Sequence, residues 1–237
     1  PFLAAFAVLF VILTRLEKSA ENPIVPPSLF DRSQLRLTYA LSAGAGFAEA
    51  GLVFLPLLAV ISLAGSGIQE KNASWMLMPV VLAMVVGSPT SGRMLDRFGS
   101  RAVILAGTSL LTVGMVLVGL FSSSLAMFIF SAVLIGLGLS ALLGAPLRYI
   151  MLNESRLEER SVAQGVVAIF SSAGQLLGGA LTGAIASSRT SAGGAGAGYS
   201  LAFLVIGGIS LFLAVTALQV KSRQAEQAAA QALQTAG

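Results

Sequence analysis

Residues 102–121 read AVILAGTSLLTVGMVLVGLF, a run of twenty residues without a single charged side chain. As a helix rising about 1.5 Å per residue, this run would cross a hydrocarbon layer roughly 30 Å thick. A lone strand in lipid would leave its backbone polar groups unpaired, so we predict a helix. Comparable runs recur along the chain, one partial and six of full length, at residues 1–14, 37–63, 75–91, 102–121, 125–147, 162–187 and 199–220. The sequence therefore predicts an all-α, polytopic membrane protein.

The composition supports this fold class and excludes several others. Of the 237 residues, 56% are hydrophobic and only 10% are charged, values outside the range of soluble domains. The chain contains no Cys and no His, so we expect no disulfide, no cofactor, no metal site and little acid-base catalysis. The net charge of +4 does not indicate a nucleic-acid partner, because the basic residues lie in short loops between apolar runs.

The basic residues also indicate how the chain is oriented in the membrane. Twelve of the 14 Lys and Arg residues fall in alternate loops, and the positive-inside rule assigns those loops, with the C-terminus, to the cytoplasmic side of the cell membrane. The chain starts inside an apolar run without an initiator Met, so we expect its first helix to be truncated. The predicted organisation is a truncated transmembrane helix (1–16), a cytoplasmic loop (17–36), a six-helix bundle (37–220) and a cytoplasmic tail (221–237).

Residues 92–101 read GRMLDRFGSR and separate two of the predicted spans. Gly92 and Gly99 permit close approach of the backbone, and Asp96 could accept from a helix N-terminus or pair with an arginine. These properties fit a functional cytoplasmic loop. A solvated basic loop that only fixes the topology fits them equally well.

This string resembles the signature loop of the major facilitator superfamily, which joins the second and third helices of each six-helix half. It lies here between the second and third full spans, the matching position. The resemblance implies that Asp96, Arg97 and Arg101 belong to a charge-relay cluster that holds one conformation of a transporter, here called the conformational latch. It also implies that Gly92 and Gly99 permit tight packing.

The region from residue 15 to residue 56 is similar to the corresponding part of bacterial 14-helix drug:proton antiporters. Together with the tail that follows the last span, this similarity implies the C-terminal half of a transporter, preceded by one helix. The partners that the resemblance implies are a small-molecule substrate, protons, the lipid bilayer and the missing N-terminal helical bundle.

Glu49 is the only one of the 24 charged residues that lies well inside a predicted span. It is roughly 20 Å along the helix from Arg36, near the middle of the bilayer. A carboxylate there is costly to ionise, so it should be neutral or face a polar cavity, as a proton-coupling residue would. Two alternatives are a permanently protonated Glu bonded to a neighbouring helix and a span boundary that places Glu49 nearer the surface.

Small residues and one amide mark the fifth full span. Gly174 with Gly178, and Gly179 with Gly183, form two repeats of small residues four apart, which predict close helix packing. Gln175 lies among them, as a contact between helices or as part of a substrate cavity.

A polar run at the inner end of the fourth full span includes Arg148 and Glu154. The two residues could form a cytoplasmic gate. Ordinary ion pairs in a solvated loop are the alternative.

These features predict a secondary active transporter that exports lipophilic or drug-like small molecules in exchange for protons, by alternating access. The alternative is a seven-span receptor or a non-catalytic subunit of a membrane assembly. An enzyme is disfavoured, because one buried acid is fewer groups than acid-base or metal chemistry generally needs.

Overall fold

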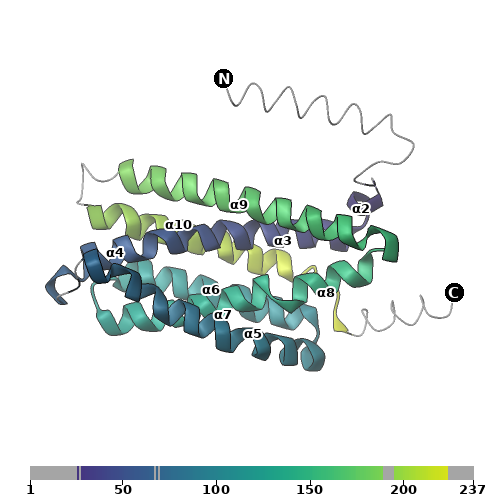
Figure 1. Ribbon diagram of the computed structural model, residues 1–237, viewed down its shortest axis with the longest axis horizontal. Helices are drawn as coiled ribbons and strands as arrows, with labels where there is room; N and C mark the ends of the chain where they lie inside the picture. Colours follow the sequence, from purple (N-terminus) through teal and green to yellow (C-terminus); the bar gives the residue numbers. More distant parts are fainter. Residues whose placement is uncertain (1–25, 27, 67, 69, 189–194, 224–237) are drawn as a thin grey trace, which may run out of the picture.

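The computed structural model describes residues 26, 28–66, 68, 70–188 and 195–223, and this part of the chain is helical without a strand (Figure 1). The predicted truncated helix (1–16), half of the predicted loop (17–36) and residues 224–237 of the tail lie outside the described residues. The described elements, in chain order, are α2 (Ser28–Asp31), α3 (Ser33–Ala50), η1 (Gly51–Phe54), α4 (Leu55–Ser62), η2 (Ala64–Ser66), η3 (Glu70–Leu77), α5 (Met78–Phe98), α6 (Ser100–Phe121), α7 (Leu125–Leu143), α8 (Ala145–Glu154), η4 (Leu157–Glu159), α9 (Arg160–Ser188) and α10 (Ala195–Ala217).

Six segments of the described chain are long and apolar enough to cross a membrane, which confirms the predicted number of full spans. They are Ser33–Ser62, Glu70–Phe98, Ser100–Phe121, Leu125–Glu154, Leu157–Ser188 and Gly196–Ala217. Two of these spans are interrupted where the sequence places Gly and Pro. Pro56 lies in the first turn of α4 and Pro146 in the first turn of α8, where a missing N–H is tolerated.

The helices pack side by side along the long axis of the molecule (Figure 1). The main contacts pair α3 with α9, α6 with α7, α10 with α6, and α5 with α7. The core between them holds large side chains that are fully buried, among them Leu111, Met115, Phe128 and Phe203. The least buried spans are those of α5 and α9. In the most apolar 18 residues of these spans, 17% and 22% are buried, against 56% for the span of α7 and α8. These two helices therefore present broad apolar faces outward.

The backbones of α3 and α9 touch at two glycines of α9. A Cβ added to Gly174 would lie 1.9 Å from the carbonyl oxygen of Ala43, and one added to Gly178 would lie 2.4 Å from that of Phe47. Real Cβ atoms do not approach so closely, so any side chain at these positions would push the helices apart. The predicted packing role of Gly174 and Gly178 is confirmed.

The second predicted repeat does not pack. A Cβ at Gly179 would meet no atom within 4 Å, and one at Gly183 would meet only the Phe54 ring at 3.8 Å. The prediction was wrong because glycines one position apart on a helix point in different directions. Of these four glycines, only Gly174 and Gly178 lie against the backbone of α3.

The segment predicted as a loop at residues 92–101 is helical except at Gly99. Helix α5 continues through Phe98, and α6 begins at Ser100. Gly99 has φ +83° and ψ 169°, a conformation that only glycine adopts readily, and its N–H donates to the Leu95 carbonyl oxygen at 2.9 Å. A single residue therefore reverses the chain, and the polar residues of the motif belong to helix ends.

Candidate functional site

Glu49 lies in the last turn of α3, just before the chain tightens into η1. It is the seventeenth residue of the 30-residue span Ser33–Ser62, so the structure does not support a position near the membrane surface. Its side chain is partly exposed on the side of α3 that borders α9. The span thus presents a carboxylate near its midpoint, away from the core.

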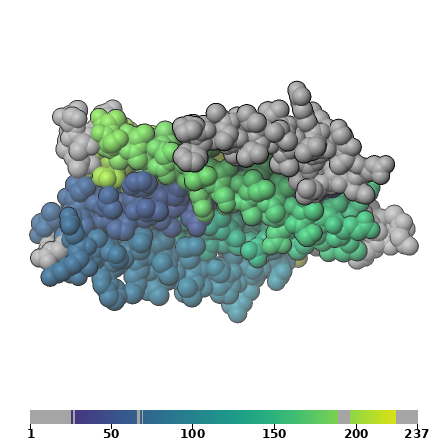
Figure 2. Space-filling model, turned by 45° about the horizontal axis from the view of Figure 1, so that its top comes forward, coloured from purple at the N-terminus to yellow at the C-terminus, as the bar shows by residue number. Residues whose placement is uncertain are grey.

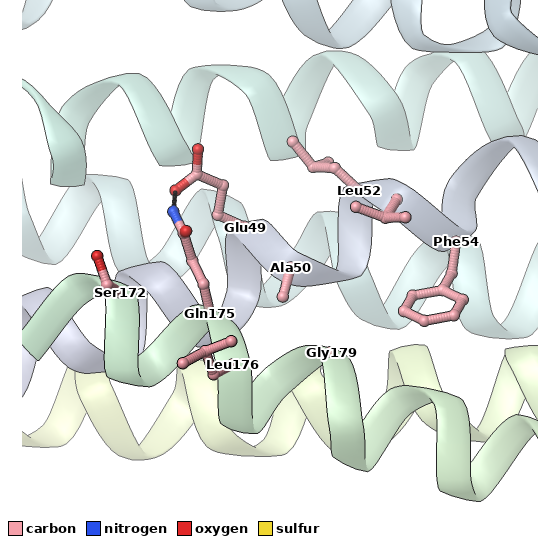
Figure 3. Close-up of a pocket in the computed structure, with 9 residues that line it drawn as sticks. Glu49, Ala50, Leu52, Phe54, Ser172, Gln175, Leu176 and Gly179 are labelled. Carbon is pink, nitrogen blue, oxygen red and sulfur yellow. Dashed lines mark hydrogen bonds between the residues drawn. The ribbon is translucent and has the colours of Figure 1, made fainter. Parts of the chain in front are cut away.

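Gln175 on α9 is the partner of this carboxylate. Its Nε2 donates a hydrogen bond to Oε2 of Glu49 at 2.7 Å, and the two side chains point toward one another in Figure 3. The sequence had singled out both residues without pairing them. The sequence left open whether Gln175 contacts another helix or lines a cavity. In the structure it does both.

The Glu49–Gln175 pair lies in a cavity of about 670 Å³ between α3, η1 and α9 (Figure 3), here called the Glu49 cavity. Its wall is otherwise mainly apolar and includes Val53 and Leu176, which are 70% and 76% exposed. The complete lining is Glu49, Ala50, Leu52, Val53, Phe54, Ser172, Gln175, Leu176 and Gly179. One carboxylate and its amide among apolar side chains fit a lipophilic molecule with a small polar group.

The Glu49 cavity lies on the outside of the six-helix bundle. Figure 2 shows the purple-blue surface of α3 and α4 between the green surface of α9 and the blue surface of α5. The apolar residues Val85 and Val86 of α5 and Leu177 of α9 are also strongly exposed. Carboxylate, cavity and exposed apolar faces are therefore available to lipid or to another set of helices.

The end of the bundle that carries Arg32, Arg97 and Arg156, here called the basic end, holds a polar network. Glu154 at the end of α8 pairs with Lys221, and its carbonyl oxygen accepts from Arg32. Glu159 accepts from the Ser28 hydroxyl at 2.9 Å and lies 4.0 Å from Arg32. These bonds tie α2, α8, η4 and the residues after α10 together.

Arg148 and Glu154, predicted as a gate, do not form a pair in the described structure. Glu154 is bound by Lys221, whereas Arg148 lines a separate, smaller cavity. Residues six apart on one helix lie on different faces, which is why the two side chains diverge. The gate role of these two residues stays a prediction, and the ion pair of Glu154 with Lys221 is of the kind expected under the alternative.

Residues 219–223, which follow α10, contact the start of α3. Gln34 donates to the Gln219 carbonyl oxygen at 3.3 Å and accepts from the Lys221 N–H at 3.1 Å. The sequence did not predict this contact. A polar residue at the start of a span was the only local signal, and its partners lie more than 180 residues away.

The residues of the predicted latch motif lie together at the basic end, although their latch role stays a prediction. Asp96 and Arg97 are exposed and Arg101 is partly exposed, and within the described residues these three form no ion pair with one another. A Cβ on Gly92 would meet nothing within 4 Å, whereas one on Gly99 would lie 2.9 Å from Cβ of Arg223. Close approach of another segment is therefore seen at Gly99 only.

Replacing Gly99 with alanine is expected to lower the free energy of unfolding by about 1–3 kcal/mol, because Gly99 has a backbone conformation essentially reserved for glycine. Thermal or denaturant unfolding of the purified protein in detergent would measure this loss. Gly92→Ala is the matched control, since Gly92 is helical and faces open space. An equal loss of stability in both variants would contradict the assignment.

Comparison with known proteins agrees with these observations. Residues 37–236 match the Major Facilitator Superfamily, and the chain belongs to this family. Members of this family are transporters that catalyse no chemical reaction. The match confirms the resemblance carried by residues 92–101.

Individual relatives are proteins named for drug resistance and export. The chain is 26% identical over 181 residues to the multidrug resistance protein Stp of Mycobacterium tuberculosis, covering 75% of this chain and 33% of that protein. It is 28% identical over 190 residues to the tetracenomycin C resistance and export protein of Streptomyces glaucescens, covering 79% and 35%. For multidrug resistance protein 2 of Bacillus subtilis the values are 27% over 159 residues, 67% and 36%. The chain thus spans about a third of the length of these curated relatives.

Proposed function

We propose that this chain forms the C-terminal six-helix half of a proton-coupled transporter that exports lipophilic small molecules. Its family membership supports transport of a small molecule across a membrane, and the names of its relatives support drug-like substrates. The basic end would face the cytoplasm, in keeping with the positive-inside rule. The cytoplasmic membrane is the expected location.

The observation that carries this proposal is the carboxylate of Glu49 in a cavity, hydrogen-bonded to Gln175. The amide of Gln175 has donors for an ionised carboxylate and an oxygen that accepts from a protonated one. The pair therefore keeps a hydrogen bond in either protonation state when the side-chain amide of Gln175 rotates to exchange its oxygen and nitrogen. This property suits an acid that must take up and release a proton during each transport cycle.

The outward position of the Glu49 cavity calls for a second set of helices. An N-terminal bundle packed against the exposed faces of α5 and α9 would close the cavity and exclude lipid from Glu49. Rocking of the two bundles about this central site would open it to each side of the membrane in turn. Protonation of Glu49 would couple that motion to the proton gradient.

Reconstitution of the full-length protein in vesicles with an imposed pH gradient tests this function. We expect a lipophilic dye to move against its concentration gradient, and movement should stop when an ionophore collapses the pH gradient. A receptor or an assembly subunit would move no dye under either condition. Absence of dye movement for a panel of lipophilic compounds would contradict the proposal.

Gly179→Leu is expected to reduce transport of bulky substrates by about tenfold without unfolding the protein, because the leucine would occupy the Glu49 cavity. The vesicle assay measures this reduction with a large and a small dye, and the large dye should be affected more. Gly165→Leu is the matched control, since Gly165 lies on the same helix, faces open space and does not line the cavity. Equal effects of the two variants would contradict a substrate role for this cavity.

A further inference from the structure

A second cavity, of about 220 Å³, lies between α3, α8 and α9 on the side of the Glu49 cavity that is nearer the basic end. Ser42, which lines the smaller cavity, precedes Glu49 by seven residues on α3, a distance of about 10 Å along the helix. Arg148 of α8 and Gln164 of α9 line it as long polar side chains. The two cavities are thus separate hollows along one helix seam.

Arg148 is an exposed residue at the mouth of this cavity, and no acidic side chain lies within 4 Å of its guanidinium group in the described part of the chain. It takes part in no hydrogen bond or ion pair there, and the single acidic residue of α3 and the single acidic residue of α8 each have another partner. Glu49 accepts from Gln175, and Glu154 is bound by Lys221. The cavity therefore presents an uncompensated guanidinium group.

The position of Arg148 along α8 determines the environment of its charge. Arg148 precedes Glu154, the last residue of α8, by six positions, which places its Cα about 9 Å inside the basic end of the helix. With the basic end at the cytoplasmic face, as proposed above, a side chain at that depth would reach the boundary between lipid headgroups and acyl chains. Electrostatic attraction is stronger there than in bulk water, so an anion would be favoured beside the guanidinium.

We infer that this smaller cavity binds the anionic group of an amphiphilic molecule, a carboxylate or a phosphate. Arg148 would donate two parallel hydrogen bonds to the anion, and the amide of Gln164 would donate another. The apolar lining residues Leu147, Met151 and Val167 would contact the hydrocarbon part. A phospholipid of the bilayer and a free amphiphilic anion share this chemistry.

Equilibrium binding of radiolabelled decanoate to the full-length protein in a neutral maltoside detergent tests the inference, with decanol as the uncharged competitor. Decanoate should bind the unmodified protein, and an equal concentration of decanol should not displace it. Arg148→Gln should weaken decanoate binding about tenfold, whereas Arg148→Lys should retain most of it. Arg156→Gln, which removes an exposed arginine outside the cavity, should leave binding unchanged.

A second variant and a second probe complete the experiment. Ala168→Phe would fill the cavity from α9 and leave the guanidinium in place, so it should also abolish binding even if Arg148→Gln fails to fold. Native mass spectrometry with phosphatidylglycerol and phosphatidylcholine identifies the source of the anion. Selective retention of phosphatidylglycerol that Arg148→Gln removes would assign the cavity to lipid, and decanoate binding without such retention would assign it to a free anion.

Decanoate binding by folded Arg148→Gln or Ala168→Phe protein at the affinity of the unmodified protein would overturn the inference. The measurement needs neither transport nor a proton gradient. Its failure would therefore leave the proposal for Glu49 intact, and failure of proton coupling would leave this cavity assignment intact.

Discussion

Glu49→Gln is expected to abolish proton-driven transport, by about 100-fold or more, while the helical bundle stays folded. Glutamine has nearly the size of glutamate and its oxygen still accepts from Nε2 of Gln175, so the contact between α3 and α9 is kept. Only the ability to gain and lose a proton is removed. Vesicle transport with an imposed pH gradient measures the loss, and thermal unfolding in detergent checks the fold.

Two further variants separate proton coupling from a structural role of Glu49. Glu70→Gln is the control for charge removal, because Glu70 is exposed in η3 and does not line the Glu49 cavity. Glu49→Asp keeps a titratable group but shortens it, so we expect weakened rather than abolished transport. If Glu49 were a permanently protonated structural residue, Glu49→Gln would transport at the normal rate, and the coupling proposal would be rejected.

The sequence predicted the six spans because hydropathy alone determines which segments enter lipid. It did not predict that α5 runs through Phe98, because the last turns of a helix outside the apolar layer are as polar as a loop. The decisive residue was Gly99, whose positive φ allows α6 to begin after a single residue. Hydropathy contains no information on that angle.

The sequence predicted the residues of the candidate site but not how they are paired. A lone acid within an apolar run is visible in the sequence, and Glu49 was identified in this way. Gln175 was also a candidate, but its pairing with Glu49 was not predicted, because the two residues are 126 positions apart and the pairing depends on the relative axial position of α3 and α9. The axial position of α9 against α3 is set by backbone contacts at Gly174 and Gly178, which only the packed structure shows.

These contacts make the seam between α3 and α9 both a stability element and the support of the site. Gly174 directly precedes Gln175, so the close approach at Ala43 brings the amide within reach of α3. Gly46 meets α9 in the same way, since its added Cβ would lie 2.1 Å from the Ser171 carbonyl oxygen. A side chain on either surface would widen the seam and separate Gln175 from Glu49.

Gly174→Leu is therefore expected to destabilise the bundle by about 3 kcal/mol or more, since leucine would overlap the backbone of Ala43. The measurable result is a large fall in the yield of monodisperse protein and in the midpoint of thermal unfolding. Gly165→Leu, the same exchange on a face of α9 with open space, should leave both unchanged. Gly174→Ala should give a smaller loss of stability together with reduced transport, because the added methyl group lengthens the Glu49–Gln175 bond before it unfolds the bundle. Normal stability of Gly174→Leu would show that the two helices are not in backbone contact, and the geometry of the proposed proton site would then have to be abandoned.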